Sequence, residues 1–472
     1  MYNRWDRNGE FIKAFAHNNI IRIEDADINF ESDLREKLSY VDKSKQYQIR
    51  KMQKNPFSRA SPLYSQLVGE SEGSLLESDG AALLVPPGFF NLIKRLVPQF
   101  QDLRSETGKS ISLPWANSSY SFSLRDYQEE AVQKALVNYR GIINFATGLG
   151  KTKTAISLIR SLKRKTLVVC PSKSIAFQFK KELEDAFGIS KVGFIGDGKY
   201  KPNLITVGIA QSVVNKIDLI KELDLGVVIV DEAHHIAAST FYSIATGLAN
   251  TGRIYGLSAT AFRSDGKDIY LQAGCGDILI ERDVKWGVAN GWLADPYFII
   301  RKVNTTGKDF KDDKLRSYKE HVLKSNIMND RLISDANAFI GDGKQTLILV
   351  DQIEHGEFLA HKLGIPFANG KDKNSEELIG ELNDRKILGL VATDGVIGEG
   401  VDTREIDVLI LANFIASKGG VLQAVGRALR KTQNKNKAII LDYSPQGSTM
   451  MKRHADQRIS YYREITHNVK IV

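Results

Sequence analysis

Cysteine is scarce in this 472-residue sequence, which contains only Cys170 and Cys275. Two isolated thiols cannot form a Cys-x-x-Cys metal site and make a poor disulfide framework, so we expect a reducing compartment. Long apolar runs are also lacking, because none approaches the roughly 20 residues needed to span a bilayer. The N-terminal segment MYNRWDR carries charge and lacks the apolar core of a signal peptide. These absences predict an intracellular chain without a membrane-spanning segment.

Neither sign of charge dominates strongly, since 65 Lys and Arg face 56 Asp and Glu, a net charge of +9. Apolar residues make up 42% and charged residues 26%, near the average for folded globular proteins, which excludes a wholly disordered chain or a collagen-like fibre. The positive excess favours an anionic partner without identifying it. Much of it lies in residues 427–472, which form either a solvated helical face or a surface that contacts phosphates.

The length predicts two to four domains. Residues 1–115 contain short apolar runs between polar stretches, which predicts a small α/β domain. Residues 108–123 are rich in serine and contain Pro114, a composition typical of a linker. One basic cluster in the first region is either a solvated surface or a contact for DNA; it comprises Lys43, Lys45, Arg50, Lys51, Lys54 and Arg59.

After residue 124, short β-branched runs alternate with stretches of helical periodicity. This alternation predicts βαβ units with buried parallel strands. The pattern lapses near residue 295 and then resumes, which indicates two successive α/β domains divided there. The expected strands are 141–145, 166–170, 204–207, 227–230 and 253–257, followed by 346–350, 389–392, 408–412 and 437–441.

A glycine-rich turn follows the first of these strands. Thr147, Gly148, Gly150, Lys151 and Thr152 lie between an apolar strand and a helix-like run. Glycines allow backbone N–H groups to face phosphate oxygens, and the helix N-terminus favours their negative charge. The lysine would reach the terminal phosphates of a nucleotide and the threonine hydroxyl would bind Mg²⁺. The generic motif has glycine where this chain has phenylalanine, and an ordinary glycine turn is the alternative.

An acidic pair follows the strand 227–230. Asp231 and Glu232 come at the carboxyl end of this apolar run, which is the ligand-binding edge of a parallel sheet. The aspartate is predicted to hold Mg²⁺, and the glutamate to orient and deprotonate an attacking water. The alternative is a polar strand end that caps the next helix. Together with the glycine-rich turn, the pair predicts ATP hydrolysis.

Further motifs occur in the order of a known family, and the sequence resembles the superfamily 2 helicases over residues 124–442. The resemblance implies two tandem RecA-like parallel-sheet domains after a small N-terminal α/β domain. It assigns ATP binding to Arg125, Gln128, Gly400 and Asp402, besides the glycine-rich turn. It assigns catalysis to Gln423, Arg427 and Arg430, the arginines acting from the second domain on phosphates held by the first. Nucleic-acid contact or coupling falls to Pro171, Ser172, Gln211, Ser212, Ser258, Thr260, Arg263 and Thr393.

Two motifs separate classes within the superfamily. His234 completes the string DEAH, which is typical of certain RNA helicases, but Leu429 stands where those enzymes usually have glycine. Residues 84–94 and the basic-aromatic residues 453–462 resemble the bacteriophage UvsW-type helicases of recombination. That resemblance implies ATP-driven branch migration of Holliday junctions and forks, with ATP and Mg²⁺ as cofactors, in the cytoplasm of an infected host. Recombination or replication proteins are expected as further partners, and a monomer is favoured.

The expected domains are residues 1–115 (accessory, with a DNA-binding role to be tested), 116–295 (ATP-binding), 296–450 (second motor domain) and 451–472 (basic helix or tail).

Three other functions stay open. They are a duplex translocase of a restriction or repair assembly, an RNA helicase, and a binding protein that uses ATP only as a clamp switch.

Overall fold

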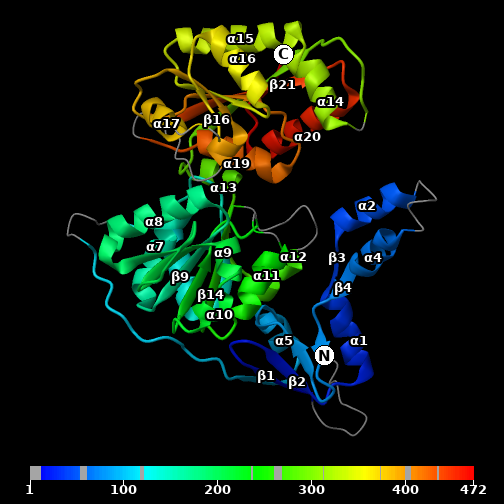
Figure 1. The fold of residues 1–472 in the computed structure, drawn as a ribbon, viewed down its shortest axis with the longest axis vertical. Coiled ribbons are helices and arrows are strands. Elements are labelled where there is room, and N and C mark those ends of the chain that lie inside the picture. Colours follow the sequence, from blue (N-terminus) through cyan, green and yellow to red (C-terminus); the bar gives the residue numbers. More distant parts are fainter. Residues whose placement is uncertain are drawn as a thin grey trace. The chain divides into compact units, whose positions relative to one another are not determined.

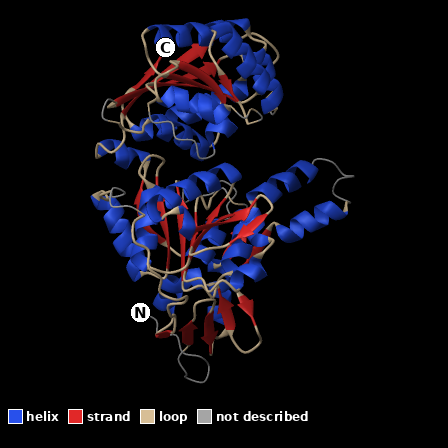
Figure 2. Ribbon diagram, turned by 60° about the vertical axis from the view of Figure 1, so that its left-hand side comes forward, coloured by secondary structure: helices blue, strands red, loops and turns tan. Residues whose placement is uncertain are grey.

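The structure is a computed structural model of the full chain. It describes residues 12–53, 61–116, 122–234, 236, 238–259, 268–311, 313–370, 372, 374–398, 405–432 and 435–472. The chain forms two compact units, one of residues 1–145 and 151–281 and the other of residues 146–150 and 282–472. Figure 1 shows the course of the chain, and Figure 2 shows that helices flank the large sheet of each unit.

The first unit begins with a five-stranded sheet. Its order is β5 (Glu77–Ser78), β6 (Leu83–Val85), β2 (Ile21–Glu24), β1 (Lys13–Ala16) and β7 (Gln99–Asp102). The β1–β7 pair is parallel, and the other three neighbouring pairs are antiparallel. Strands β1 and β2 bury every second residue, so one sheet face forms a core with α1 (Ile28–Lys37) and α5 (Phe90–Leu96). A short 3₁₀ turn, Pro87–Phe89, precedes α5.

A helical hairpin interrupts this small domain between β2 and β5. Strands β3 (Ser39–Val41) and β4 (Glu72–Ser74) pair antiparallel, and between them run α2 (Lys43–Gln53) and α4 (Pro62–Glu70). We call residues 39–74 the arm. In both views of the molecule the two helices project away from the remainder of the first unit (Figures 1 and 2).

The small domain is packed firmly on the larger sheet of the same unit. Arg140 is buried and donates to the carbonyls of Gly274 (2.6 Å), Asn18 (2.7 Å) and Ala249 (3.0 Å). Gly88 lies so close to α12 (Asp268–Cys275) that a Cβ there would fall 1.8 Å from the Gln272 carbonyl oxygen. A side chain at this glycine would therefore force the two layers apart, so their close packing requires glycine here.

The large sheet of the first unit has eight strands. Their order is β11 (Lys199–Lys201), β10 (Val192–Gly196), β12 (Ile205–Ile209), β9 (Thr166–Cys170), β13 (Val227–Val230), β14 (Arg253–Ser258), β8 (Arg140–Phe145) and β15 (Ile278–Arg282). The pairs from β10 to β8 are parallel. The other helices of the unit are α6 (Asp126–Val137), α7 (Lys151–Leu162), α8 (Lys173–Phe187), α9 (Ala210–Val214), α10 (Ile217–Lys221) and α11 (Ala238–Gly247), with a 3₁₀ turn at Ile189–Lys191.

The segment predicted as a linker, in its described part, follows the surface of this sheet domain in contact with it. The Trp115 ring stacks on Phe187 with centroids 5.5 Å apart, and the Arg160 guanidinium lies 4.2 Å from the Trp115 centroid. Just before the segment, Glu106 accepts from Arg253 at 2.5 Å. Contacts of this kind explain why the first unit includes both domains.

The second unit contains a seven-stranded parallel sheet. Its order is β18 (Phe367–Ala368), β19 (Gly389–Thr393), β17 (Thr346–Val350), β20 (Val408–Ala412), β21 (Lys437–Pro445), β16 (Asp295–Val303) and β22 (Val469–Ile471). Its helices are α13 (Val284–Ala289), α14 (Lys314–Tyr318), α15 (Asn326–Gly341), α16 (Ile353–Leu363), α17 (Ser375–Asn383), α18 (Asp394–Gly398), α19 (Lys418–Ala428) and α20 (Thr449–Ile465), with a π-helical turn at Lys319–Leu323.

The end of the chain is integrated into this second unit. Residues 451–472, expected as a separate basic helix or tail, form most of α20 and then β22, which is an edge strand beside β16. Arg458 of α20 is 1% exposed and forms a two-pronged ion pair with Asp442 at 2.8 and 2.9 Å. At least this cation is structural, so the segment is not wholly a surface for phosphates.

Within the described residues, no helix is both long and apolar enough to cross a membrane.

Candidate functional site

The glycine-rich turn has the predicted strand–turn–helix form. Strand β8 is buried throughout and leads into residues 146–150, and α7 begins at Lys151. Gly148 and Gly150 have φ angles of 90° and 83°, which side-chain-bearing residues rarely adopt. The two glycines are therefore required by the backbone of the turn. Their conformation opens the turn toward the first residues of α7, where Lys151 and Thr152 lie.

The acidic pair lies at the carboxyl end of β13, beside the ends of β9 and β14. Asp231 is 7% exposed, and its backbone N–H donates to the Val169 carbonyl at 2.8 Å. Glu232 has a φ of 43°, the left-handed region, which costs a non-glycine residue about 1–3 kcal/mol. Such backbone strain persists where the surrounding structure holds a side chain in a required direction. Here the left-handed conformation directs the Glu232 carboxylate out of the end of β13.

Three predicted site residues and His234 of the DEAH string form one connected series that spans three strand ends. The Lys151 ammonium lies 3.1 Å from the Glu232 carboxylate, and the other oxygen of that carboxylate lies 3.5 Å from Nδ1 of His234. The same His234 nitrogen is 2.8 Å from the Ser258 hydroxyl. The series joins the phosphate-loop lysine to the end of β14, where Ser258 begins the third motif.

The charge state of this cluster suits a cation. Burial first, and then the neighbouring Glu232 carboxylate, raises the pKa of Asp231 to about 7, while Lys151 counteracts the rise. The negative charge of the buried Asp231 carboxylate is only partly balanced by nearby positive charge, so this group is a suitable ligand for Mg²⁺. The Thr152 hydroxyl at the start of α7 could supply another oxygen ligand. No group of three or more metal-binding side chains occurs among the described residues. One or two protein ligands with substrate phosphates is the arrangement that Mg²⁺ usually takes.

Arg125 and Gln128 lie at the start of α6. The Gln128 side chain is 3% exposed, and its Oε1 accepts from the Arg125 backbone N–H at 3.0 Å. The Arg125 guanidinium donates to the Tyr127 hydroxyl at 2.9 Å. The sequence left a solvated helix residue as the alternative for Gln128, and the structure instead shows a buried residue that caps its own helix. Recognition of adenine by Gln128 stays a prediction.

Among the described residues of the first unit, those predicted to contact nucleic acid share one edge of the sheet. Ser172 follows β9 and is the N-cap of α8, accepting from the Ile175 N–H at 3.5 Å. Gln211 and Ser212 lie in α9, directly after β12. Because β9 and β12 are adjacent and parallel, with Cys170 opposite Ile209, these segments lie side by side at the same carboxyl edge as the acidic pair.

In the second unit, Gln423, Arg427 and Arg430 are half-buried. Their spacing of four and then three residues places Gln423 and Arg427 on one face of α19, and Arg430 continues it just beyond the helix. Thr393 ends β19 and is followed by Asp394, whose pKa is raised by burial while the nearby Arg427 lowers it. The fifth and sixth motifs are therefore neighbours within this unit.

Lys435 is a supporting residue that the sequence did not single out. It is 2% exposed, and its ammonium donates to the Ala428 carbonyl at the end of α19 at 2.5 Å. Burial lowers its pKa to about 8. A cation at a helix C-terminus is favourable because the last carbonyls carry partial negative charge. Lys435 thus stabilises the end of α19, next to Arg427 and Arg430. In the sequence it is only a lysine in a polar stretch, which gave no signal of this role.

Several predicted residues lie outside the described part of the chain, so their roles stay predictions. They are Thr260, Arg263, Gly400 and Asp402, together with Lys54 and Arg59 of the basic cluster.

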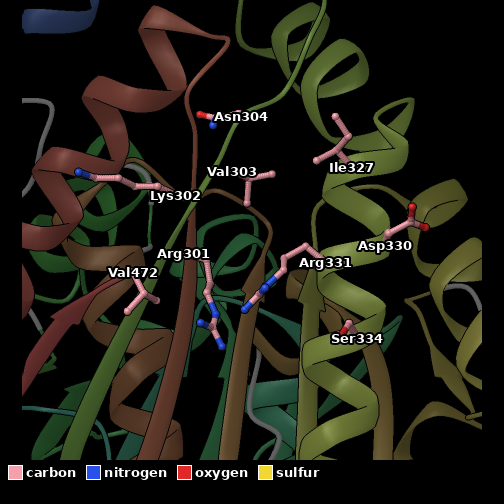
Figure 3. A pocket seen from close by; sticks show the side chains of 9 residues that line it. All are labelled: Arg301, Lys302, Val303, Asn304, Ile327, Asp330, Arg331, Ser334 and Val472. Atoms are coloured by element: carbon pink, nitrogen blue, oxygen red, sulfur yellow. The ribbon is translucent and has the colours of Figure 1, made fainter.

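One pocket of about 600 Å³ lies elsewhere in the second unit, between the end of β16, α15 and Val472. Figure 3 shows Arg301 and Arg331 extending toward each other within it. Both guanidinium groups bind Asp335, at 3.1 and 3.0 Å, so much of their charge is neutralised. The residues that line it include none of the predicted site residues.

Two family models match the chain at the segments that carry these motifs. Residues 121–263 match the model described as Type III restriction enzyme, res subunit, and residues 329–432 match the Helicase conserved C-terminal domain. The chain is a superfamily 2 helicase. Its two large parallel sheets are accordingly RecA-like domains, and it is an ATP hydrolase of this family, as the sequence predicted.

Individual relatives are distant. A probable helicase of Escherichia phage T5, D10, is 28% identical over 336 residues, covering 68% of this chain and 71% of that protein. The ATP-dependent DNA helicase uvsW of Enterobacteria phage T4 is 25% identical over 347 residues and 67% of each chain. The fold is shared with a fragment of a putative HsdR subunit of a type I restriction enzyme from Vibrio vulnificus, with a TM-score of 0.55, 20% identity and coverage of 71% and 66%.

Proposed function

We propose that this helicase uses ATP hydrolysis, with Mg²⁺, to remodel branched DNA such as forks and four-way junctions. The observation that carries the proposal is the series Lys151–Glu232–His234–Ser258, which joins a phosphate loop to the strand that leads into the third motif. Such a series is expected in a motor, because a static nucleotide clamp needs no link from its hydrolytic glutamate to the end of the neighbouring strand, where the third motif begins.

The chemistry assigned to the chain's own residues follows from their positions. Lys151 now pairs with Glu232, and a bound γ-phosphate would compete for its ammonium. Glu232 is then able to orient and deprotonate the attacking water. Thr152 and Asp231 would hold Mg²⁺, which would neutralise charge on the phosphates. Arg427 and Arg430 are proposed to stabilise the transferring phosphoryl group, as the family resemblance implies.

The choice of DNA rests on the activity for which relatives are named and on this chain's sixth motif. The T4 relative is described as a DNA helicase, and Leu429 follows Arg427 and Ala428 as in DNA-directed members. The choice of branched DNA rests on the resemblance to UvsW-type helicases. Action in the host cytoplasm, with recombination or replication proteins as partners, belongs to the same proposal.

A duplex translocase is the second candidate, because the restriction-subunit family model covers residues 121–263. Such a motor would consume ATP on long linear duplexes without separating strands.

The test is a panel of labelled substrates at one salt concentration, comprising a four-way junction, a fork, a tailed linear duplex and the matching RNA duplex. We expect ATP-dependent product from the junction and the fork, and none with Lys151→Ala. Equal or greater activity on the linear or RNA duplex would overturn the branched-DNA assignment. ATP consumption on linear duplex without product would favour the translocase.

A further inference from the structure

The arm is a braced and stable element. Its two antiparallel helices are tied at both ends, because Lys45 binds Glu70 at 2.5 Å and the Gln53 amide donates to the Tyr64 hydroxyl at 3.3 Å. Ile49 and Leu67 are buried, 9% and 8% exposed, on the sides that pack together. The bracing keeps the exposed face of α2 in one orientation.

The outer face of α2 has an unusual composition for a surface helix. Tyr47 follows Lys43 by four residues, and Arg50 and Lys51 follow Tyr47 by three and four residues, so the four side chains lie on one helix face. The three cations are exposed and form no ion pair with any residue that the structure describes. Tyr47 is 70% exposed. Helix α2 contains no acidic residue, so nothing along this face cancels the charge.

The base of the arm is joined to the ATP-binding domain by three tyrosines. Tyr40 of β3 packs on Tyr270 of α12 with ring centroids 4.9 Å apart, and Tyr242 of α11 packs on Tyr270 at 5.1 Å. Gly73 leaves room for this cluster, because a Cβ there would lie 2.7 Å from the Tyr40 hydroxyl. Helix α11 follows the DEAH string and α12 follows the third motif. The arm therefore rests on the two helices that leave the ATPase cluster.

From this geometry we infer that the arm binds the DNA at a branch point, on a surface separate from the motif-bearing edge of the large sheet in the same unit. Lys43, Arg50 and Lys51 bind backbone phosphates, and Tyr47 stacks on a base left unpaired at the junction. The inference rests on the proposed function, and it names the part of the substrate that the accessory domain recognises.

The partner is argued from charge and shape. The eight helical steps from Lys43 to Lys51 span about 12 Å, so the cations reach several consecutive phosphates of one strand. An aromatic ring among cations is the arrangement that proteins use for unpaired bases, since every base offers a face for stacking. A paired duplex keeps its bases stacked internally, so the tyrosine favours junctions and forks over linear duplex.

The test compares two triple variants of the full-length protein. Lys43→Gln/Arg50→Gln/Lys51→Gln removes the cations of the arm, and Lys181→Gln/Lys199→Gln/Lys201→Gln removes three exposed cations from α8 and β11 of the same unit. Affinity is measured for a four-way junction, a fork, a linear duplex and a single strand over a range of salt. Melting temperatures of all proteins are compared first, so that a folding defect is recognised.

For the arm variant we expect junction and fork affinity to fall about tenfold or more. The slope of log affinity against log salt should decrease by up to about 2.7, or 0.9 for each of three phosphate contacts. ATP hydrolysis at saturating single strand should stay within about twofold of wild type, because the arm contributes none of the motor motifs. Tyr47→Ala should weaken junction binding about fivefold or more, by loss of one stacked base, and leave linear duplex unchanged.

Two outcomes would overturn the inference. One is an equal effect of the arm and control variants, which would mean that only total charge matters. The other is unchanged junction affinity in the arm variant, which would assign the arm to a protein partner instead. Failure of the proposed function itself is distinguishable, because the wild-type protein would then lack ATP-dependent activity on junctions and forks before any variant is compared.

Discussion

The two RecA-like domains use their ionisable residues in different ways. In the first, the functional groups contact one another directly, from Lys151 through Glu232 and His234 to Ser258. In the second, buried ionisable groups lie beneath the functional ones. Lys435 supports the end of α19, and the Arg458–Asp442 pair joins α20 to β21.

This difference indicates that the charged residues of the two domains have different roles. The first domain places its charges where a nucleotide's phosphates would compete for them, so their contacts are expected to change during a cycle. In the second domain the buried charges stabilise the end of α19 and the packing of α20 on β21. They are therefore expected to keep the arginines of the sixth motif in a fixed position. Substitutions should therefore act directly on turnover in the first domain, and in the second on stability or on the position of the sixth-motif arginines.

The largest effect is expected from Lys151→Ala. Loss of a cation that stabilises phosphate charge should lower kcat for ATP about 10²–10³-fold, while the melting temperature changes little. Steady-state ATP hydrolysis with saturating DNA measures this, and Lys153→Ala, an exposed neighbour on α7, is the matched control. Residual turnover above about one tenth of wild type would contradict the comparison.

Arg458→Ala should act on stability instead. Removing one partner of a buried ion pair leaves the Asp442 carboxylate uncompensated, which costs about 3–5 kcal/mol. Urea unfolding of the second domain measures the loss. Arg463→Ala, an exposed arginine of the same helix, should stay within about 0.5 kcal/mol of wild type. A small effect of Arg458→Ala would show that the pair is not a support.

Arg458 also shows what the sequence could and could not predict. Strands 166–170, 227–230, 346–350 and 408–412 were predicted with the bounds that the structure has, because buried parallel strands are continuous apolar runs. The sequence marked Arg458 only as part of a basic tail, since pairing with Asp442 depends on how α20 folds back. Strand β16 was missed because Pro296 and the lapse in pattern indicated a break, yet proline occupies the second position of this strand.

The site was predictable where a motif fixes residue spacing and was not where contacts are long-range. Lys151, Asp231, Glu232 and Ser258 were identified from motifs, and the structure brings them to one sheet edge. The strained backbone of Glu232 and the buried Lys435 carried no signal of their own. Likewise, the sequence contained the cations of the arm but could not show that three of them share a face with Tyr47.

Acid should destabilise the second domain through His355. This histidine is fully buried, with Nδ1 2.7 Å from the Tyr318 hydroxyl and Nε2 2.9 Å from Asn329 Oδ1. Burial lowers its pKa from 6.5 to about 4. Because the unfolded state then binds the proton more readily, stability should fall by about 3 kcal/mol as pH decreases from 6.5 to 4. Melting temperatures against pH measure this, and His355→Gln should flatten that part of the curve; an unchanged curve would contradict the assignment.

A smaller effect is expected from Lys435→Met. Loss of the bond to the Ala428 carbonyl should displace the turn between Arg427 and Arg430, lowering kcat about tenfold with KM for ATP nearly unchanged. Lys435→Arg should restore part of kcat, since it keeps a donor at the helix end. An effect on KM alone would indicate that Lys435 acts on nucleotide binding rather than on the position of the arginines.

The most direct test of the account is to follow one four-way junction with ATP and with a non-hydrolysable ATP analogue in parallel. If hydrolysis in the first domain drives remodelling, the junction is converted only with ATP, and the analogue supports binding without conversion. Equal conversion with the analogue, or by Lys151→Ala, would contradict the account and favour a nucleotide-gated clamp.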